Sequence, residues 1–496
     1  MSLKKIFETT KSLTLQTKSF LKRVNGYIHQ RFKKVKIYTK KDHQLEDLYN
    51  KRRYLRTKED QNSKEELEQL EEKLAQKYSE SMYKKIKHEL KAMNGEEGGY
   101  NPGHLWKLKK KLSPQQRDTP TTMKDESGKL LTTTDEIVKE AQKHYRKVVE
   151  QKPIEKGLEA HQIQREALCE ERLKIASQNK TPMWTPEDVR IAIKSLNIGI
   201  SKDPYGIPNE ILKEGIAGNG LIKALVVLMN KIKDNPKDYP EAMNLCNVTS
   251  IYKNKGDRNK FDSHRGVFRT TFLRNLLDRL IYNDKYKNVD ENLTDCNVGS
   301  RRRRNIRDNL FVMNALMNAS QKGHNQPCDI NVYDVRKCFD FLWLMECIND
   351  LFESGLNNDK LNILYYSNIN AQIAVKTSNG VSEKFNIQKV VMQGTVWAGL
   401  MCTTTMDKLG KQFYANPNMM YKYRSEALVP PLQMVDDVIC ASKCGNQVIT
   451  SNAAITMFAK LKKLELSETK CARIHIGKNK CDQCAKICVN GIEIKE

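Results

Sequence analysis

The most regular pattern of apolar and polar positions lies at residues 331–355. Val332, Tyr333 and Val335 form a short apolar run that predicts a β-strand, and Asp334 stands within it. The pattern then changes to helical spacing over 344–352, with apolar residues on one face, and Gly355 is placed to end that helix. We therefore expect Asp334 where a strand gives way to a helix.

Two further apolar runs, 432–435 and 438–441, are separated only by Asp436 and Asp437. This arrangement predicts a tight hairpin that carries two carboxylates at its tip. The simpler interpretation is an ordinary turn, because Asp accepts turn geometry and hydrogen-bonds its own backbone. The pair gains significance only in combination with the motifs described below.

A long helix is predicted nearer the N-terminus, where Ser63 and Glu66 form a capping box and Asn94 with Gly95 ends the pattern. The apolar residues that recur there at helical spacing are Leu67, Leu70, Leu74, Tyr78, Met82, Ile86 and Leu90. We expect this helix to pack with residues 44–55 as an intramolecular hairpin. A short coiled coil is the alternative.

Capping residues predict two more helix starts. Thr185, Pro186 and Asp188 supply an N-cap, a first-turn proline and an acid that the helix dipole favours. Thr133 and Glu136 form a second capping box. Helices are therefore expected to begin directly after residues 133 and 185.

Composition adds a strong basic surplus. The 496 residues contain 85 Lys and Arg against 60 Asp and Glu, a formal net charge of +25. This surplus favours a polyanionic partner, nucleic acid before membrane, since the sequence contains no 18-residue apolar span. The first residues lack the apolar core of a signal peptide, and 13 scattered cysteines are typical of a reducing compartment.

The basic residues are densest near the start of the chain. Residues 1–41 hold twelve Lys or Arg and a single acid, Glu8. This arm is either a solvated, frayed helical tail or a segment that contacts phosphates. Residues 105–112 place four lysines among apolar residues, as in an ordinary amphipathic helix or a basic-aromatic contact to nucleic acid.

The acidic residues carry the candidate chemistry. Three ionised carboxylates side by side are costly without counter-charge, so Asp334, Asp436 and Asp437 imply bound divalent cations. Oxygen-only ligands favour Mg²⁺, with Mn²⁺ also possible. Two such ions can activate a hydroxyl and stabilise a leaving oxygen, which is the chemistry of nucleotidyl transfer.

An ordered series of motifs resembles the reverse transcriptase region of non-LTR (LINE-like) retrotransposons, from about Leu105 to the C-terminus. The motifs are SKDPYGIPNEILKEG, IYKNKGDRNKFDSHRGVFR, VYDVRKCFD, VMQGTVWAGL, MVDDV and LKKLELSETKC. The resemblance implies an α+β fold with fingers and palm, the palm being an antiparallel sheet backed by helices, preceded by a helical N-terminal region.

The resemblance also implies an order of domains. We expect a basic helical region at 1–104, a connector at 105–184, fingers at 185–325, a palm at 326–470 and the start of a thumb or tail at 471–496. The endonuclease and long thumb of complete family members are not recognisable, so the chain looks like a truncated copy.

In the resemblance, Asp334, Asp436 and Asp437 match the metal-binding acids, and Val335 would add its backbone carbonyl. Lys470 matches a late lysine that protonates pyrophosphate as general acid. A solvated lysine at a helix end is the alternative for Lys470.

Further residues match the nucleotide site of the family. Lys253 and Arg265 would bind the triphosphate, whose charge needs fixed cations. Phe339 matches an aromatic that excludes a ribose 2′-OH, while Gln393 and Gly394 match the lining of the nucleotide pocket. The alternative for Lys253 and Arg265 is a generic basic loop, and the alternative for Phe339 is a core aromatic.

Four adjacent arginines form the densest basic cluster. Arg301, Arg302, Arg303 and Arg304 precede a helical pattern. Within a fingers region we expect them to hold template phosphates, although such a cluster also occurs as a localisation-like patch.

The sequence therefore favours an RNA-directed DNA polymerase of a LINE-like element that extends a primer with dNTPs on an RNA template, using two Mg²⁺ ions. Two rivals stay open: a non-catalytic relic that still binds element RNA, and an RNA-templated RNA polymerase or intron maturase. We expect an intracellular protein, in nucleus or cytoplasm, without a membrane partner. His475, Cys481, Cys484 and Cys488 do not form a full zinc finger.

Overall fold

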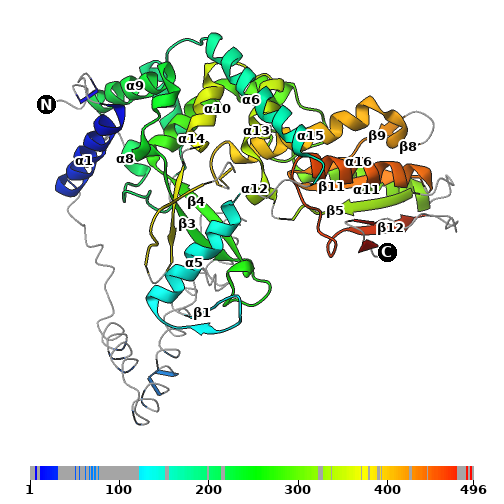
Figure 1. The fold of residues 1–496 in the computed structure, drawn as a ribbon, viewed down its shortest axis with the longest axis horizontal. Helices are drawn as coiled ribbons and strands as arrows, with labels where there is room; N and C mark the ends of the chain where they lie inside the picture. Colours follow the sequence, from blue (N-terminus) through cyan, green and yellow to red (C-terminus); the bar gives the residue numbers. More distant parts are fainter. Residues whose placement is uncertain are drawn as a thin grey trace, which may run out of the picture. The chain divides into compact units, whose positions relative to one another are not determined.

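The fold is described from a computed structural model. It describes residues 6–7, 12–31, single positions between 48 and 76, 122–150, 156–197, 200–213, 218–321, 328–336, 338–369, 371–377, 380–387, 391–392, 394–423, 427–443, 445–476, 488–489 and 492–493. The chain divides into one unit formed by Met1–Asn25 with Asp118–Glu496, and a second unit formed by Gly26–Arg117. Figure 1 shows the labelled helices and strands.

A four-stranded antiparallel sheet carries the acidic residues. Its order is β10 (Leu432–Met434), β11 (Asp437–Ser442), β5 (Cys328–Tyr333) and β12 (Ala472–Ile476). Because side chains alternate along a strand, Cys328 and Ile330 point to one face, where they form a buried cluster with Leu316 of α11 (Ile306–Gln321).

The other face of this sheet packs on α16 (Asn446–Leu461). The hydroxyl of Tyr333 bonds to the Asn452 side chain at 3.2 Å, and the Ser442 and Ser451 hydroxyls lie 3.2 Å apart. Helices thus cover both faces of an antiparallel sheet. The expected α+β fold with this palm architecture is confirmed.

A second four-stranded sheet has the order β4 (His264–Thr270), β3 (Leu245–Tyr252), β6 (Gln372–Lys376) and β7 (Phe385–Asn386). β3 pairs with β4 in antiparallel and with β6 in parallel orientation. Residues from the expected palm range thus complete the sheet of the expected fingers, so no single point of the chain separates the two sheets. The domain limits themselves stay predictions.

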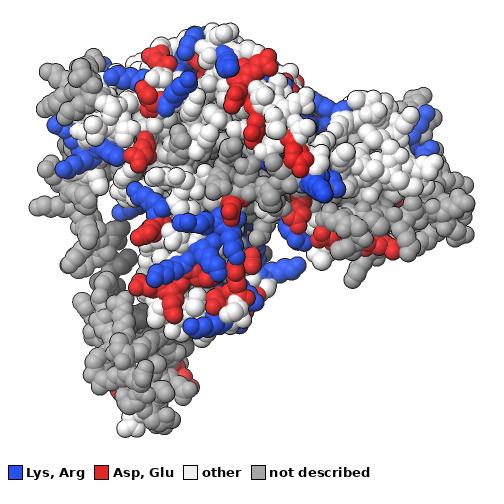
Figure 2. Space-filling model, in the orientation of Figure 1, with Lys and Arg blue, Asp and Glu red and all other residues white. Residues whose placement is uncertain are grey.

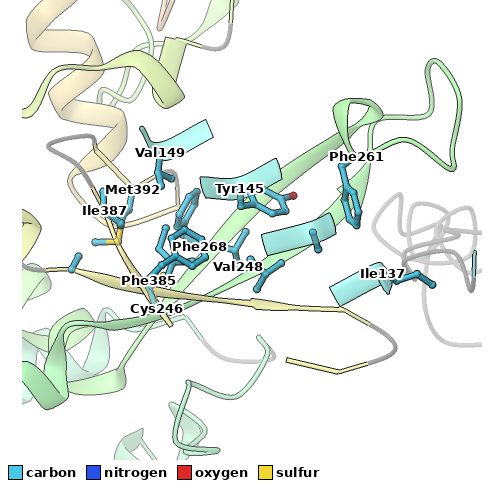
Figure 3. Close-up of a cluster of buried hydrophobic side chains, with 14 of the residues drawn as sticks. Ile137, Tyr145, Val149, Cys246, Val248, Phe261, Phe268, Phe385, Ile387 and Met392 are labelled. Carbon is cyan, nitrogen blue, oxygen red and sulfur yellow. The ribbon is translucent and has the colours of Figure 1, made fainter. Parts of the chain in front are cut away.

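The helix α5 (Thr134–Val149) covers one face of this second sheet. Figure 3 shows Tyr145 and Val149 of α5 among Val248, Phe268 and other buried side chains. The Tyr145 hydroxyl also lies 2.9 Å from the Ser250 hydroxyl. The core of the second sheet is therefore mainly apolar, with one buried hydrogen bond that fixes α5.

The remaining elements are mostly helical. The helices are α6 (Glu159–Gln178), α7 (Pro186–Lys194), α8 (Glu210–Lys213), α9 (Asn219–Asp234), α10 (Phe272–Glu291), α12 (Cys338–Phe341), α13 (Leu344–Glu353), α14 (Asp359–Ile369) and α15 (Ala398–Ala415). The short strands are β1 (Met123–Lys124), β2 (Leu130–Leu131), β8 (Tyr421–Tyr423), β9 (Ala427–Val429), β13 (Cys488–Val489) and β14 (Ile492–Glu493). Turns of 3₁₀ helix lie at Pro236–Asp238, Glu241–Met243, Phe261–Ser263 and Pro417–Met419.

The predicted helix boundaries at Thr133, Thr185 and Gly355 are confirmed. Thr133 and Thr185 both form capping boxes, and α7 begins at Pro186. The helix α13 ends at Glu353, and Gly355 has a positive φ of 97°. Among the described residues, no helix combines the length and apolarity needed to cross a membrane.

The basic arm forms a helix, α1 (Leu13–Arg31), in the part that is described. Phe20 is fully buried against Phe7, with ring centroids 5.4 Å apart, and Lys18 lies 3.2 Å from Glu241. Residues 13–25 of the arm therefore have a buried apolar face, which a frayed tail would lack. A phosphate contact from this arm stays a prediction.

The second unit contains the contacts expected of the intramolecular hairpin. Leu48 and Leu55 pack with Leu70, and Lys51 lies 2.5 Å from Glu66. The predicted caps at 63 and 94–95 and the segment 105–112 lie outside the described residues.

Figure 2 shows that basic and acidic side chains intermingle over α5 and β1 on the face in view. Lys143 and Lys147 both pair with Glu126, and Lys124 pairs with Asp257. The net positive charge is thus partly neutralised locally on this face, so the charge surplus alone does not identify a binding surface there.

A buried ionic network ties α13 to its neighbours. Glu346 of α13 accepts hydrogen bonds from Arg165 of α6 at 2.6 and 2.9 Å, and also from Lys462. Lys462 also donates to both oxygens of Asp350, at 3.0 and 3.1 Å. Since both acids are at least 97% buried, their charges depend on these cations.

Replacing Lys462 with methionine is expected to cost about 3–5 kcal/mol of stability, because Glu346 and Asp350 then lose a buried counter-charge. Urea unfolding followed by circular dichroism measures the loss. The matched control is Lys287→Met at the exposed pair with Glu291, which should change stability by less than about 0.5 kcal/mol. Equal losses in the two variants would contradict the role given to Lys462.

Candidate active site

Strand register brings the acidic residues together. Asp334 directly follows β5, and Tyr333 pairs with Val438 of β11, so the adjoining Asp437 lies beside Asp334. Asp437 also pairs with Met434, which leaves Val435 and Asp436 as the two-residue turn of the β10–β11 hairpin. The predicted hairpin and the predicted strand exit thus meet at one end of one sheet.

The acids influence one another electrostatically. Burial, followed by the charges of Asp437 and Asp334, raises the pKa of Asp436 to about 6. Burial and the Asp334 charge also raise the pKa of Asp437. The ionised cluster is therefore unfavourable by itself, and any cation that binds it relieves this repulsion.

Lys470 supplies one such cation. Its ammonium group donates to both carboxylate oxygens of Asp334, at 3.0 and 2.9 Å, and is 59% exposed. The backbone positions it, because Ser467 donates to the Asp334 carbonyl at 2.8 Å and Leu466 bridges Val335. Lys470 therefore lies inside the site, and its role as general acid stays a prediction.

The carboxylates of Asp334, Asp436 and Asp437 are chemically suitable ligands for a hard divalent cation. Carboxylate oxygens are the ligands that Mg²⁺ and Mn²⁺ prefer, and the Lys470 ammonium already stands where positive charge is favourable. Within the described part of the chain, however, no group of three acidic, imidazole or thiol side chains lies close enough to hold a metal as it stands. Cation binding would require Lys470 to release Asp334.

The predicted nucleotide-binding residues lie in several elements. Val335 is buried beside Asp334, and Phe339 is half-buried in α12. Gln393 lies outside the described residues. Gly394 has φ of 101°, and a Cβ there would lie 3.0 Å from the Phe268 carbonyl oxygen, so glycine permits this loop to approach β4.

Lys253 and Arg265 belong to the second sheet. Arg265 is exposed on β4 opposite Ile251, and Lys253 follows β3 and donates to the Asp262 carbonyl at 2.9 Å. That they meet a triphosphate held by the acids stays a prediction.

The four arginines differ in their surroundings. Arg301 is only 4% exposed, pairs with Asp290 at 2.7 Å and donates to nearby backbone carbonyls. Arg302 lies over Tyr286, 4.7 Å from the ring centroid, and Arg304 pairs with Asp295 at 2.5 Å. Template contact stays a prediction for Arg301, Arg302, Arg303 and Arg304, and at Arg301 it would require the Asp290 pair to open.

The residues considered for zinc are mostly outside the described parts. Cys481 and Cys484 lie there, and Cys488 begins β13. His475 lies in β12, where its Nδ1 is 2.9 Å from the buried carboxylate of Asp329. This contact gives His475 a partner within the sheet.

The sequence pattern does not indicate one segment that contributes to the site, residues 296–298. Residues 296–298 extend alongside β10: Gln433 donates to the Cys296 carbonyl at 2.8 Å, and Val298 donates to the Gln433 carbonyl at 3.1 Å. No periodicity marks this segment, because it is a single added strand-like stretch before the arginine cluster. Its contact with β10 arises only on folding.

The fold and the site together define a class: an antiparallel palm sheet that carries three clustered aspartates at one end is the architecture of a nucleotidyl-transferring polymerase. Residues 255–490 match the family model described as reverse transcriptase (RNA-dependent DNA polymerase). This match, which covers just under half of the chain, indicates an RNA-directed DNA polymerase, which is a nucleotidyltransferase.

Comparison with curated proteins finds no match. Among solved structures, the chain is similar to an apo telomerase from Candida tropicalis truncated from its C-terminal domain, with 14% identity and a TM-score of 0.35. The similarity covers 50% of this chain and 53% of the telomerase chain, so the chain spans about half the length of that relative.

Replacing Asp436 with asparagine is expected to stabilise the metal-free protein at pH 7.5. The raised pKa of about 6, against 3.8 ordinarily, means that the folded state loses stability as pH rises from about 4 to 6. Allowing for solvent screening, the gain is about 1 kcal/mol, and it should vanish below about pH 4.

Thermal unfolding in EDTA and in Mn²⁺ measures this effect, with Asp234→Asn at the exposed end of α9 as control. Mn²⁺ should raise the melting temperature of the wild type but not of the Asp436 variant. A variant that is less stable than the wild type in EDTA would contradict the repulsion inferred here.

Proposed function

We propose that this chain is an RNA-directed DNA polymerase of the non-LTR, LINE-like type, which adds dNTPs to a primer 3′-OH on an RNA template. The observation that supports it most is the meeting of Asp334, Asp436 and Asp437 at one end of the palm sheet, within the region that matches the reverse transcriptase model. The motif series supports the LINE-like subtype.

In this proposal Asp334, Asp436, Asp437 and the Val335 carbonyl hold two divalent cations, Mg²⁺ or Mn²⁺. The cations would supply activation of the 3′-hydroxyl and stabilisation of the leaving oxygen. The raised pKa values of Asp436 and Asp437 support this, because a bound cation favours the ionised carboxylates that burial disfavours.

The reaction forms a bond between the primer 3′-oxygen and the α-phosphorus and breaks the bond to pyrophosphate. The 3′-hydroxyl proton passes to solvent, and Lys470, released from Asp334, donates a proton to the pyrophosphate oxygen. Lys253 and Arg265 neutralise the triphosphate, with Gln393 and Gly394 lining the pocket. The exposed Arg302, Arg303 and Arg304 hold template phosphates.

A second candidate is a non-catalytic RNA-binding relic. It is favoured by the net charge of +25 and by the Lys470 ammonium, which already neutralises Asp334. Such a relic would keep the fold, bind element RNA through phosphate contacts and need no cation. We place either protein inside the cell, in nucleus or cytoplasm, where template RNA is found.

Extension of oligo(dT) on poly(rA) with Mg²⁺ or Mn²⁺ separates the two functions. We expect incorporation by the wild type and a loss of at least about 10³-fold in Asp436→Ala, because one of the proposed cation ligands is removed. The control Asp234→Ala on α9 should remain active. No incorporation together with salt-sensitive RNA binding that Asp436→Ala leaves unchanged would support the relic.

Replacing Phe339 with alanine tests sugar selection. If the half-buried ring excludes a ribose 2′-OH, the variant should accept rNTPs about 10-fold better relative to dNTPs. The reason is that a steric barrier is removed while the catalytic groups stay unchanged. The ratio of kcat/KM values for dTTP and UTP measures it, with Phe341→Ala in the same helix as control. Equal use of both substrates by the wild type would favour the RNA polymerase or maturase alternative.

A further inference from the structure

Asn297 lies against the turn that carries Asp436, and it is fully buried. Its side-chain nitrogen donates to the Val435 carbonyl at 2.9 Å, and its side-chain oxygen accepts from the Val435 N–H at 3.1 Å. The same oxygen accepts from the Gly299 N–H at 2.9 Å. One amide thus holds both backbone polar groups of a turn residue.

Val435 needs such support because of its backbone conformation. Its φ is 62°, in the left-handed region that β-branched residues rarely adopt. The conformation directs the turn so that Asp436 follows at the tip and Asp437 enters β11. A strained backbone conformation next to candidate metal ligands persists only when contacts with the surrounding residues hold it in place.

The segment 296–299, here called the clamp segment, leaves no space around the turn. A Cβ at Gly299 would lie 2.3 Å from the Val435 nitrogen and 2.5 Å from its Cγ2 atom. The backbone bonds between Val298, Cys296 and Gln433 fix the register of the clamp segment on β10. The turn is therefore held by side chain, backbone and close packing at once.

We propose that Asn297 is a positioning residue for the nucleotidyl-transfer site: it holds Val435 in the left-handed conformation and so presents Asp436 for cation binding. This inference deepens the proposed function and rests on it. Asn297 would not touch substrate or cation. Its effect passes through the backbone of one residue to the neighbouring carboxylate, as with groups that orient metal ligands.

The test compares two pairs of variants in the full chain. Asn297→Ala is matched by Asn349→Ala, another fully buried asparagine whose amide donates to a backbone carbonyl, that of Arg165, away from the turn. Gly299→Ala is matched by Gly220→Ala, where a Cβ meets nothing within 4 Å. Each control reproduces the chemical change without touching the turn.

Mn²⁺ affinity, measured by electron paramagnetic resonance, is the first readout. Asn297→Ala and Gly299→Ala should bind Mn²⁺ about 10- to 100-fold more weakly than the wild type, and the controls within about 2-fold. In primer extension, the required Mn²⁺ concentration should rise while the KM for dNTP stays unchanged. Losses in Asn297→Ala no larger than in Asn349→Ala would overturn the proposal.

A rescue variant separates positioning from simple destabilisation. Glycine adopts positive φ without steric cost, so Val435→Gly should recover at least about 5-fold of the Mn²⁺ affinity lost in Asn297→Ala. The same substitution should not improve Asn349→Ala. Absence of rescue in the Asn297→Ala background would overturn the link through the conformation of Val435.

Amide hydrogen exchange distinguishes failure of the clamp from failure of the proposed function. Exchange of the Val435 N–H should accelerate at least about 10-fold in Asn297→Ala, whether or not the chain incorporates nucleotide. A wild type that neither binds Mn²⁺ nor extends primers overturns the proposed function, whereas unchanged exchange in Asn297→Ala overturns the clamp.

Discussion

The antiparallel pairing of β11 with β5 is the constraint on which the site depends. Val438 lies opposite Tyr333, and this register sets Asp437 beside Asp334 although the two are far apart in sequence. A slip by one residue would turn every side chain of β11 to the opposite face and would move Asp437 away from its place beside Asp334. Apolar packing against α11 and polar contacts to α16 therefore determine where the carboxylates lie, since the acids themselves repel one another.

Charge in this molecule is tolerated by two different means. In the helical layer, the acids of α13 are buried and neutralised within the protein, by Lys462 and Arg165. At the end of the palm sheet, Lys470 neutralises Asp334 from a position that is more than half exposed and so can be exchanged for another cation. The first network is suited to hold helices together, whereas the second lies where solvent can reach it.

The palm does not stand alone, because chain segments cross between the two sheets. β6 belongs to the expected palm range of the sequence but pairs with β3, and the Gly394 loop approaches the backbone of β4. In the same way, the clamp segment precedes the arginine cluster yet pairs with β10. The arginine cluster is thus connected through the preceding backbone to β10, which forms the hairpin of Asp436 with β11.

The sequence alone was sufficient for the local structure: the caps at Thr133 and Thr185, the strand exit at Asp334 and the hairpin with Asp436 at its turn. These features depend on neighbouring residues, whose periodicity and capping chemistry are visible in the chain. Only the tertiary structure decided the burial of Arg301, the pair of Lys470 with Asp334 and the hold of Asn297 on Val435. Such contacts join residues more than a hundred positions apart, or turn a side chain toward the core, so no local pattern records them.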